Sequence, residues 1–231
     1  MDPRKRLIEA RTAADAGYHD VALAGYIWFH DHALEHEPSL YGVRLSFALS
    51  DWKELAEKYP PALIALTRVR NNKVDALERG DQSRALFHDI ASINEYLGDE
   101  ASTYGLFQKL DRVNPEFARK CASLAIEAIV AAADFSLAAR YHPDPESALL
   151  DFSEQLNRDV TDHRAGPPVK APRLDAYTHI YCQRVRNTIC ILKGLSKRRD
   201  AEIAREWAVA LVEDRRIRSR VRDVLYSSTD A

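Results

Sequence analysis

Hydrophobic residues recur three or four positions apart along almost the whole of this 231-residue chain. That is the period of an α-helix, and the alternation typical of strands is nowhere sustained. Prolines divide the pattern: Asp2-Pro3 caps a first segment, Pro38 ends a second and Pro60-Pro61 ends a third. The chain has only 8 glycines for turns. The pattern therefore predicts an all-α protein of about eleven helices.

The clearest predicted unit is a pair of helices between residues 84 and 115. Its first apolar stripe is formed by Leu86, Ile90, Ile93 and Leu97, and the return stripe by Thr103, Leu106, Phe107, Leu110 and Val113. Gly98-Asp99 separates the two, and Asn114-Pro115 closes the second. Because so short a turn makes neighbouring helices antiparallel, the segment is predicted to be a helical hairpin.

This hairpin resembles a tetratricopeptide repeat, a motif of 34 residues. Counted from Arg84, Gly98 and Asp99 fall at positions 15 and 16, Phe107 at 24 and Pro115 at 32, with Ala91 at the small position 8. Asn94, Thr103 and Leu110 depart from the pattern, and a second, weaker match lies around Gly17-Tyr18 and Pro38. The resemblance implies antiparallel hairpins stacked as an α-solenoid, with a partner bound on the concave face.

The resemblance also implies which residues line the groove. In such repeats five positions of the first helix face the partner, and here they are Ala85, His88, Ser92, Glu95 and Tyr96. The alternative is a polar face in contact only with solvent. Because positions 5 and 9 lack the Lys and Asn that grip a carboxylate in some members of this family, a C-terminal carboxylate is not the expected anchor.

Proline and glycine also suggest the domain organisation. One helix is predicted from Pro115 to a break at His142-Pro143-Asp144-Pro145. Residues 161–173, which contain Gly166-Pro167-Pro168 and Pro172, are predicted to be a loop. We therefore expect a repeat region over 1–160. The basic helices of 174–231 are expected to pack on the same domain and to cap the solenoid, because terminal repeats need a polar outer face.

Histidines offer candidate metal ligands. His32 and His36 lie four residues apart, the spacing that lets two imidazoles bind one cation, although Glu35 is expected to point away from both. Two His-Asp dipeptides, His30-Asp31 and His88-Asp89, are similar to the ligand pair of metal-dependent phosphohydrolases with a helical core. The spacings of the other histidines do not suit that family. A helical hydrolase using His32, His36, His88 and Asp89 is therefore kept as an alternative function.

The charge of the chain is unevenly distributed. Residues 181–231 hold 12 Lys+Arg and 7 Asp+Glu, a net charge of +5, so the total of −2 leaves −7 for the first 180 residues. The basic surface consists of Lys197, Arg198, Arg199, Arg215, Arg218 and Arg222. It makes nucleic-acid association a third possibility. Interleaved acidic residues and the lack of an aromatic stacking platform favour solubility or packing as its role.

Three cysteines are too few for a disulfide framework, so a reducing cytoplasm is expected. No apolar run suggests an export signal or a membrane span. No phosphate loop or nucleophile motif is present, and no cofactor is expected. The function expected from the sequence is a non-enzymatic scaffold or adaptor that binds a protein or peptide.

Overall fold

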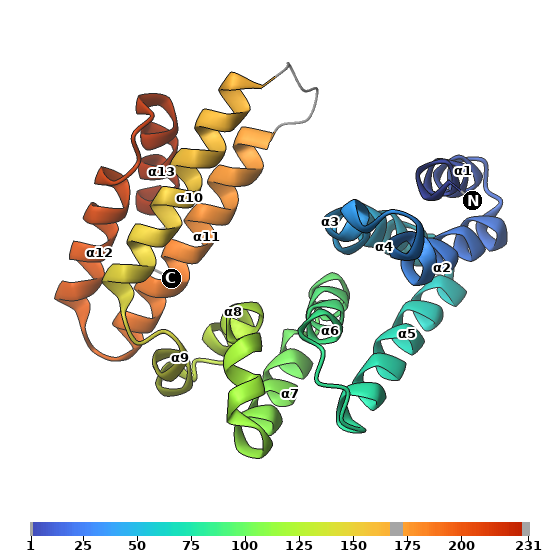
Figure 1. The fold of residues 1–231 in the computed structure, drawn as a ribbon, viewed down its shortest axis with the longest axis horizontal. Coiled ribbons are helices and arrows are strands. Elements are labelled where there is room, and N and C mark those ends of the chain that lie inside the picture. Colours follow the sequence, from blue (N-terminus) through green and yellow to red (C-terminus); the bar gives the residue numbers. More distant parts are fainter. Residues whose placement is uncertain (1, 167–172, 228–231) are drawn as a thin grey trace. The chain divides into compact units, whose positions relative to one another are not determined.

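The computed structural model describes residues 2–166 and 173–227, and every regular element in these ranges is a helix (Figure 1). The prediction of an all-α chain is confirmed. The helices form two compact units, Met1–Ala125 and Ile126–Ala231. Within the described ranges, no helix combines the length and the apolar character needed to cross a membrane.

The first unit contains α1 (Pro3–Asp15), α2 (His19–His36), the 3-10 helix η1 (Pro38–Leu40), α3 (Tyr41–Leu45), α4 (Phe47–Lys58), α5 (Pro60–Glu78), α6 (Arg84–Leu97) and α7 (Glu100–Val113). Helix α8 (Pro115–Ala131) contains the boundary between the units. The second unit continues with α9 (Phe135–Tyr141), α10 (Pro145–Ala165), α11 (Arg173–Gly194), α12 (Arg198–Ala210) and α13 (Arg215–Ser227).

Side-chain caps fix several helix starts. The Asp2 carboxylate accepts hydrogen bonds from the backbone N–H groups of Arg4 and Lys5 at the start of α1, and Ser83 and Asp99 cap α6 and α7 in the same way. These oxygens satisfy N–H groups that have no partner within the helix. Gly98 ends α6 with φ +68°, a left-handed conformation that suits glycine. The turn expected at Gly98-Asp99 is therefore present.

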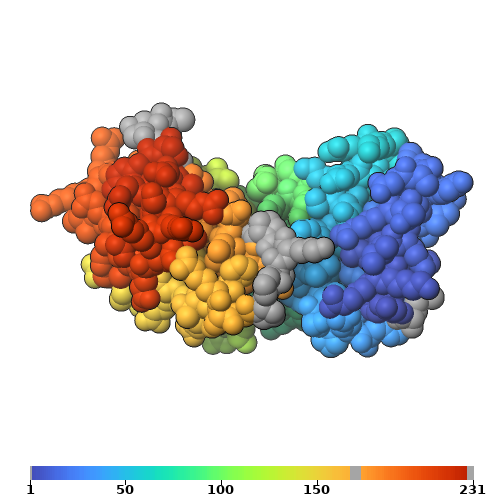
Figure 2. Space-filling view, turned by 90° about the horizontal axis from the view of Figure 1, so that it is seen from above, coloured from blue at the N-terminus to red at the C-terminus, as the bar shows by residue number. Residues whose placement is uncertain are grey.

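In the first unit, helices adjacent in sequence pack against each other, and α4 also contacts α1, α2 and α6. Gly25 of α2 lies so close to α1 that a Cβ there would come within 2.7 Å of the Ala10 Cβ. The largest fully buried side chains of this unit are Trp52, Phe29, Phe87 and Phe107. Figure 2 shows the N-terminal helices of this unit, coloured blue to cyan, packed closely together.

In the second unit, α11 is the central helix. It contacts α9, α10, α12 and α13, and its buried residues run from Thr178 to Leu192. The Tyr181 hydroxyl donates a hydrogen bond of 2.6 Å to the Ala208 carbonyl of α12. Gly194 permits close contact with α9, since a Cβ there would lie 2.1 Å from the Phe135 Cδ2 atom. Contact on several sides explains why apolar residues cover more than one face of this helix.

Two predicted helices are interrupted. The segment from Tyr41 to Tyr59 is divided at Ser46, whose φ of −122° and ψ of −91° are not helical. The helix expected from Pro115 to the break at His142 is divided into α8 and α9. Helix α8 ends at Ala131, because Ala133 adopts a φ of +56° and the Asp134 side chain caps α9 by accepting from the Leu137 N–H. An Asp cap before a short helix is a local signal that the apolar periodicity conceals.

The boundary between the two compact units lies between residues 125 and 126. Helix α10 continues through Ala165, into the segment expected to be a loop, and residues 167–172 of that segment lie outside the described ranges. The basic helices α12 and α13 therefore share a unit with α9, α10 and α11.

Candidate functional site

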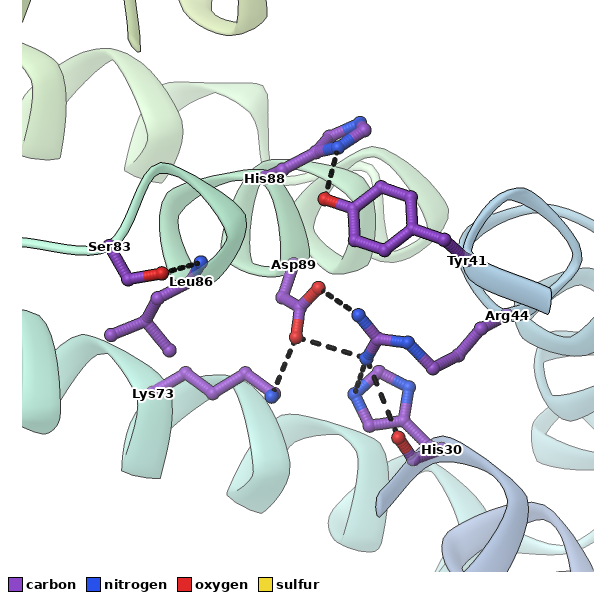
Figure 3. Close-up of polar contacts among 8 residues, drawn as sticks. All are labelled: His30, Tyr41, Arg44, Lys73, Ser83, Leu86, His88 and Asp89. Atoms are coloured by element: carbon purple, nitrogen blue, oxygen red, sulfur yellow. Dashed lines mark hydrogen bonds and ion pairs between the residues drawn. The ribbon is translucent and has the colours of Figure 1, made fainter. Parts of the chain in front are cut away.

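Four helices of the first unit contribute charged or polar side chains to one buried cluster (Figure 3). His30 comes from α2, Arg44 from α3, Lys73 from α5 and Asp89 from α6. His30, Arg44 and Asp89 are each exposed by 5% or less. Since charged groups are almost never buried without partners, the contacts within this cluster decide what it can do.

Asp89 is the centre of the cluster, and both of its carboxylate oxygens are engaged. Arg44 Nη1 donates to Asp89 Oδ2 at 3.0 Å, Arg44 Nη2 donates to Oδ1, and Lys73 Nζ donates to Oδ2 at 2.7 Å. Burial alone would raise the pKa of Asp89, but the hydrogen bonds and charges of Arg44 and Lys73 outweigh it and hold that pKa below its usual value. Asp89 is therefore a carboxylate fixed by two cations.

His30 completes the cluster as a neutral side chain. Arg44 Nη1 lies 3.3 Å from His30 Nε2, and the imidazole packs edge-on against Trp52 with ring centroids 6.2 Å apart. Burial, followed by the charges of Arg44 and Lys73, lowers the pKa of His30 to about 3. The Nδ1 atom is buried and has no hydrogen-bond partner among the described residues. The ring is thus held uncharged beside an arginine.

A second pair lies at the edge of the cluster. The Tyr41 hydroxyl and His88 Nδ1 are 2.9 Å apart, and the Tyr41 ring also lies 5.7 Å from the Arg44 guanidinium carbon. Burial and the nearby Arg84 charge lower the pKa of His88. Burial and the Asp89 charge raise the pKa of Tyr41. Both groups are therefore neutral near pH 7.

The contacts of this cluster indicate a structural role, which is to hold neighbouring helices together. A general base works best with a pKa near the working pH and within reach of its substrate. Asp89 and His30 are buried, have pKa values moved away from neutrality, and point at protein partners. Their contacts join α3 to α2 and α6, and α6 to α5. We therefore interpret the cluster as a polar clamp and look for function on the surface that it supports.

The five residues expected to line the groove have different surroundings. Ala85 and Glu95 of α6 are exposed, whereas Ser92 is buried. His88 is half-buried against Tyr41, and the Tyr96 hydroxyl donates a hydrogen bond of 3.0 Å to the Ser46 carbonyl. Helix α3 and the junction at Ser46 therefore contact His88 and Tyr96 of this face, while Ala85 and Glu95 stay exposed.

The four alternative metal ligands are committed to other contacts. His32 and His36 both pack on the Trp28 ring, with centroids 5.7 and 5.8 Å away. Glu35 was expected to point away from them, but its Oε1 lies 3.2 Å from His32 Nδ1. That expectation was wrong because residues three apart on a helix share a face. Across the described residues, no three His, Cys, Asp or Glu side chains converge in an arrangement suited to a metal ion.

No family model, no curated protein and no solved structure matches this chain. The functional assignment therefore depends on the geometry of this chain.

The expected basic surface divides into exposed and engaged residues. Lys197, Arg198, Arg199, Arg215 and Arg222 are exposed. Arg218 instead donates to the Val212 carbonyl at 2.6 Å and to the Glu213 carbonyl at 3.3 Å. It therefore ties down the connection between α12 and α13, and we assign it a structural role.

Sequence reasoning missed Arg44 and Lys73, the two cations of the clamp. Arg44 lies beside Leu45 in an otherwise apolar stretch, and a charge at such a position signals a buried pair. His88 and Asp89 were identified as a dipeptide, but as metal ligands. Adjacent positions on a helix point about 100° apart, and in this hairpin Asp89 faces the core while His88 faces Tyr41.

Proposed function

We infer that this protein is a non-enzymatic interaction module whose first unit is a tetratricopeptide-like solenoid that binds a protein or peptide. The observation that carries this proposal is the row formed by α1, α4 and α6. Helix α4 contacts both α1 before it and α6 after it, as the inner helices of stacked hairpins do. The surface of α1, α4 and α6 is named here the inner row.

The inner row carries exposed side chains suited to recognition. Phe47, at the start of α4, has 64% of its surface exposed, and Glu95 of α6 is exposed as well. Exposed aromatic residues are enriched among the anchors of protein interfaces. The polar clamp fixes the position of α6 in this row, because Arg44 and Tyr41 of α3 contact Asp89 and His88 of α6.

The proposal is tested by panning a library of displayed linear peptides against the full chain. Peptides that bind the inner row should lose about tenfold or more in affinity for a Phe47→Asp variant, the loss typical of a central anchor. Leu63→Asp is the matched control, since Leu63 is 46% exposed but belongs to α5, outside the inner row. Circular dichroism and thermal unfolding establish that both variants remain folded. Peptides that bind both variants as tightly as the native chain would contradict the proposal.

A further inference from the structure

A small hollow opens on the first unit between α1, α2 and α4. Its volume is about 180 Å³, below the roughly 300–1,000 Å³ usual for small-molecule pockets, so it fits one side chain better than a whole ligand. The residues that line it are Arg11, Ala14, Asp15, His19, Tyr26, Asp51, Glu54, Leu55 and Lys58. Two of the three helices that form it, α1 and α4, belong to the inner row.

Tyr26 is a buried polar group in the wall of this hollow. Its side chain is 2% exposed, and no hydrogen bond joins its hydroxyl to another part of the described chain. The hydroxyl oxygen itself is not fully buried, so it can form a hydrogen bond with a group that enters the hollow. Burial, followed by the Asp51 charge, raises the pKa of Tyr26 to about 12, so the hydroxyl stays protonated. Asp15 and Glu54, which also line the hollow, raise this pKa too. The hydroxyl is thus a protonated group among carboxylates.

The charges in the hollow favour a cation. Asp51 is already neutralised by Arg11, whose Nε lies 2.7 Å from Asp51 Oδ2. Neither Asp15 nor Glu54 forms an ion pair with any described residue, and Lys58 is the remaining lysine or arginine in the lining. Two uncommitted carboxylates and a hydroxyl oxygen therefore offer acceptors, opposed by one ammonium group. Such acceptors suit a donor-rich cationic side chain.

We propose that the hollow between α1, α2 and α4 binds a lysine or arginine side chain of the partner peptide. The proposal rests on the proposed function and deepens it, because it assigns a chemistry to one position of the bound partner. The aliphatic stem of the side chain lies along Ala14 and Leu55, and its charged end reaches Tyr26, Asp15 and Glu54. A neutral side chain of the same shape lacks the charge that these carboxylates attract.

The test uses two small probes and the full chain. N-acetyl-L-arginine N-methylamide carries the cation, and N-acetyl-L-citrulline N-methylamide is its neutral analogue of nearly the same shape. We expect saturable chemical-shift changes at the Tyr26 ring with the arginine probe at millimolar concentration. The citrulline probe should bind at least about fivefold more weakly, since it lacks the charge-assisted hydrogen bonds. Equal binding of the two probes, or no saturable change, overturns the proposal.

Four variants localise the effect. Tyr26→Phe keeps the buried ring and removes the hydroxyl, and Glu54→Gln removes one carboxylate; each should weaken binding of the arginine probe about threefold or more. Lys58→Gln removes the opposing cation and should strengthen binding. Glu57→Gln, on the same helix but outside the lining, should leave it unchanged. If Glu57→Gln weakens binding as much as Glu54→Gln, the proposal fails.

The same variants separate this proposal from the proposed function. Suppose that displayed peptides lose binding to Phe47→Asp but bind Glu54→Gln and Tyr26→Phe as they bind the native chain. The inner row then binds a partner while the hollow does not, which overturns the basic side chain alone. Suppose instead that the arginine probe binds as expected and that no displayed peptide loses affinity for Phe47→Asp. The hollow is then a cation site, and the proposal that the inner row binds a peptide is wrong.

Discussion

Asp89 shows how a buried charge constrains a fold. Its carboxylate is 5% exposed and accepts hydrogen bonds from two cations on two other helices. Transferring such a group out of water is costly, and the cost is recovered only while every partner is in place. Removing one member of the cluster should therefore destabilise the fold strongly, because the remaining charged groups stay buried without a partner.

We predict that Asp89→Asn lowers the free energy of unfolding by about 3 kcal/mol, since it leaves Arg44 and Lys73 beside a neutral amide. Urea denaturation followed by circular dichroism measures the change. Asp75→Asn, an exposed carboxylate on α5, is the control and should alter the stability by less than about 0.5 kcal/mol. A similarly small loss in Asp89→Asn would mean that the clamp contributes no stability.

His30 predicts a dependence of stability on pH. Its pKa is about 3 in the folded chain and about 6.5 in an unfolded one, so the unfolded chain takes up the proton first. Stability from the neutral ring is fully present above pH 6.5 and is lost as the pH falls toward 3. Between pH 7.5 and 5.0 this amounts to about 2 kcal/mol. The lowered pKa of Asp89 acts in the same direction, but only below about pH 4.

The measurement is urea unfolding of the native chain and of His30→Gln at both pH values. Gln keeps an acceptor for Arg44 and cannot be protonated, so the variant should lose about 2 kcal/mol less than the native chain on acidification. His88 and His142 also have lowered pKa values, but both are present in the native chain and in the variant. The difference in pH dependence between the two proteins therefore reports on His30. His36→Gln, an exposed histidine, should behave like the native chain.

At the scale of the helix, sequence predicts best where a local signal and the apolar period agree. The α6–α7 hairpin begins, turns and ends near the predicted residues, because Gly98, Asp99 and Pro115 are strong local signals. Asn94 breaks the repeat pattern, yet its Nδ2 donates to Thr103 Oγ1 and its Oδ1 accepts from Arg70. A residue that links three helices cannot be identified from its own helix.

The candidate site was predicted only in part for the same reason. His88 and Asp89 were found because they form a recognisable dipeptide. Their partners Tyr41, Arg44 and Lys73 lie 16 to 47 residues away along the chain, on helices whose register is set by packing. The hollow at Tyr26 escaped notice because Tyr26 belongs to an apolar stripe. The sequence pattern does not distinguish a buried hydroxyl that has a partner from one that lines a hollow.

Ala133 gives a prediction about the connection between α8 and α9. Its φ of +56° is left-handed, a region that costs an L-residue about 1–2 kcal/mol. We expect Ala133→Gly to raise the free energy of unfolding by about 0.5–1 kcal/mol, part of the gain being offset by the flexibility of glycine. Ala176→Gly, at an exposed position inside α11, should lower it by about 1 kcal/mol. Denaturation midpoints compare the two, and a loss of stability in Ala133→Gly would contradict the left-handed assignment.

At the scale of the whole chain, the positive charge is concentrated toward the C-terminal helices, because residues 181–231 carry a net charge of +5. Helices α12 and α13 hold four exposed residues of the predicted basic surface, and Lys197 directly precedes α12. Acidic residues are interleaved with them, among them Asp200 and Glu202 on α12. A polyanion therefore meets both signs of charge on this surface. Attraction of this kind is sequence-independent and depends on how many cations reach a phosphate.

We predict that a DNA duplex binds only non-specifically, with a Kd of roughly 10–100 μM at physiological salt. Replacing both Arg198 and Arg199 by Gln should make the slope of log K against log salt shallower by about 1.8, because each lost phosphate contact removes about 0.9. Arg218→Gln should leave the slope unchanged and lower the thermal stability, since this guanidinium is bound to two backbone carbonyls. Fluorescence anisotropy at several salt concentrations gives both slopes. A sequence-dependent Kd in the nanomolar range would make nucleic acid the partner and place the interaction surface on the second unit instead of the inner row.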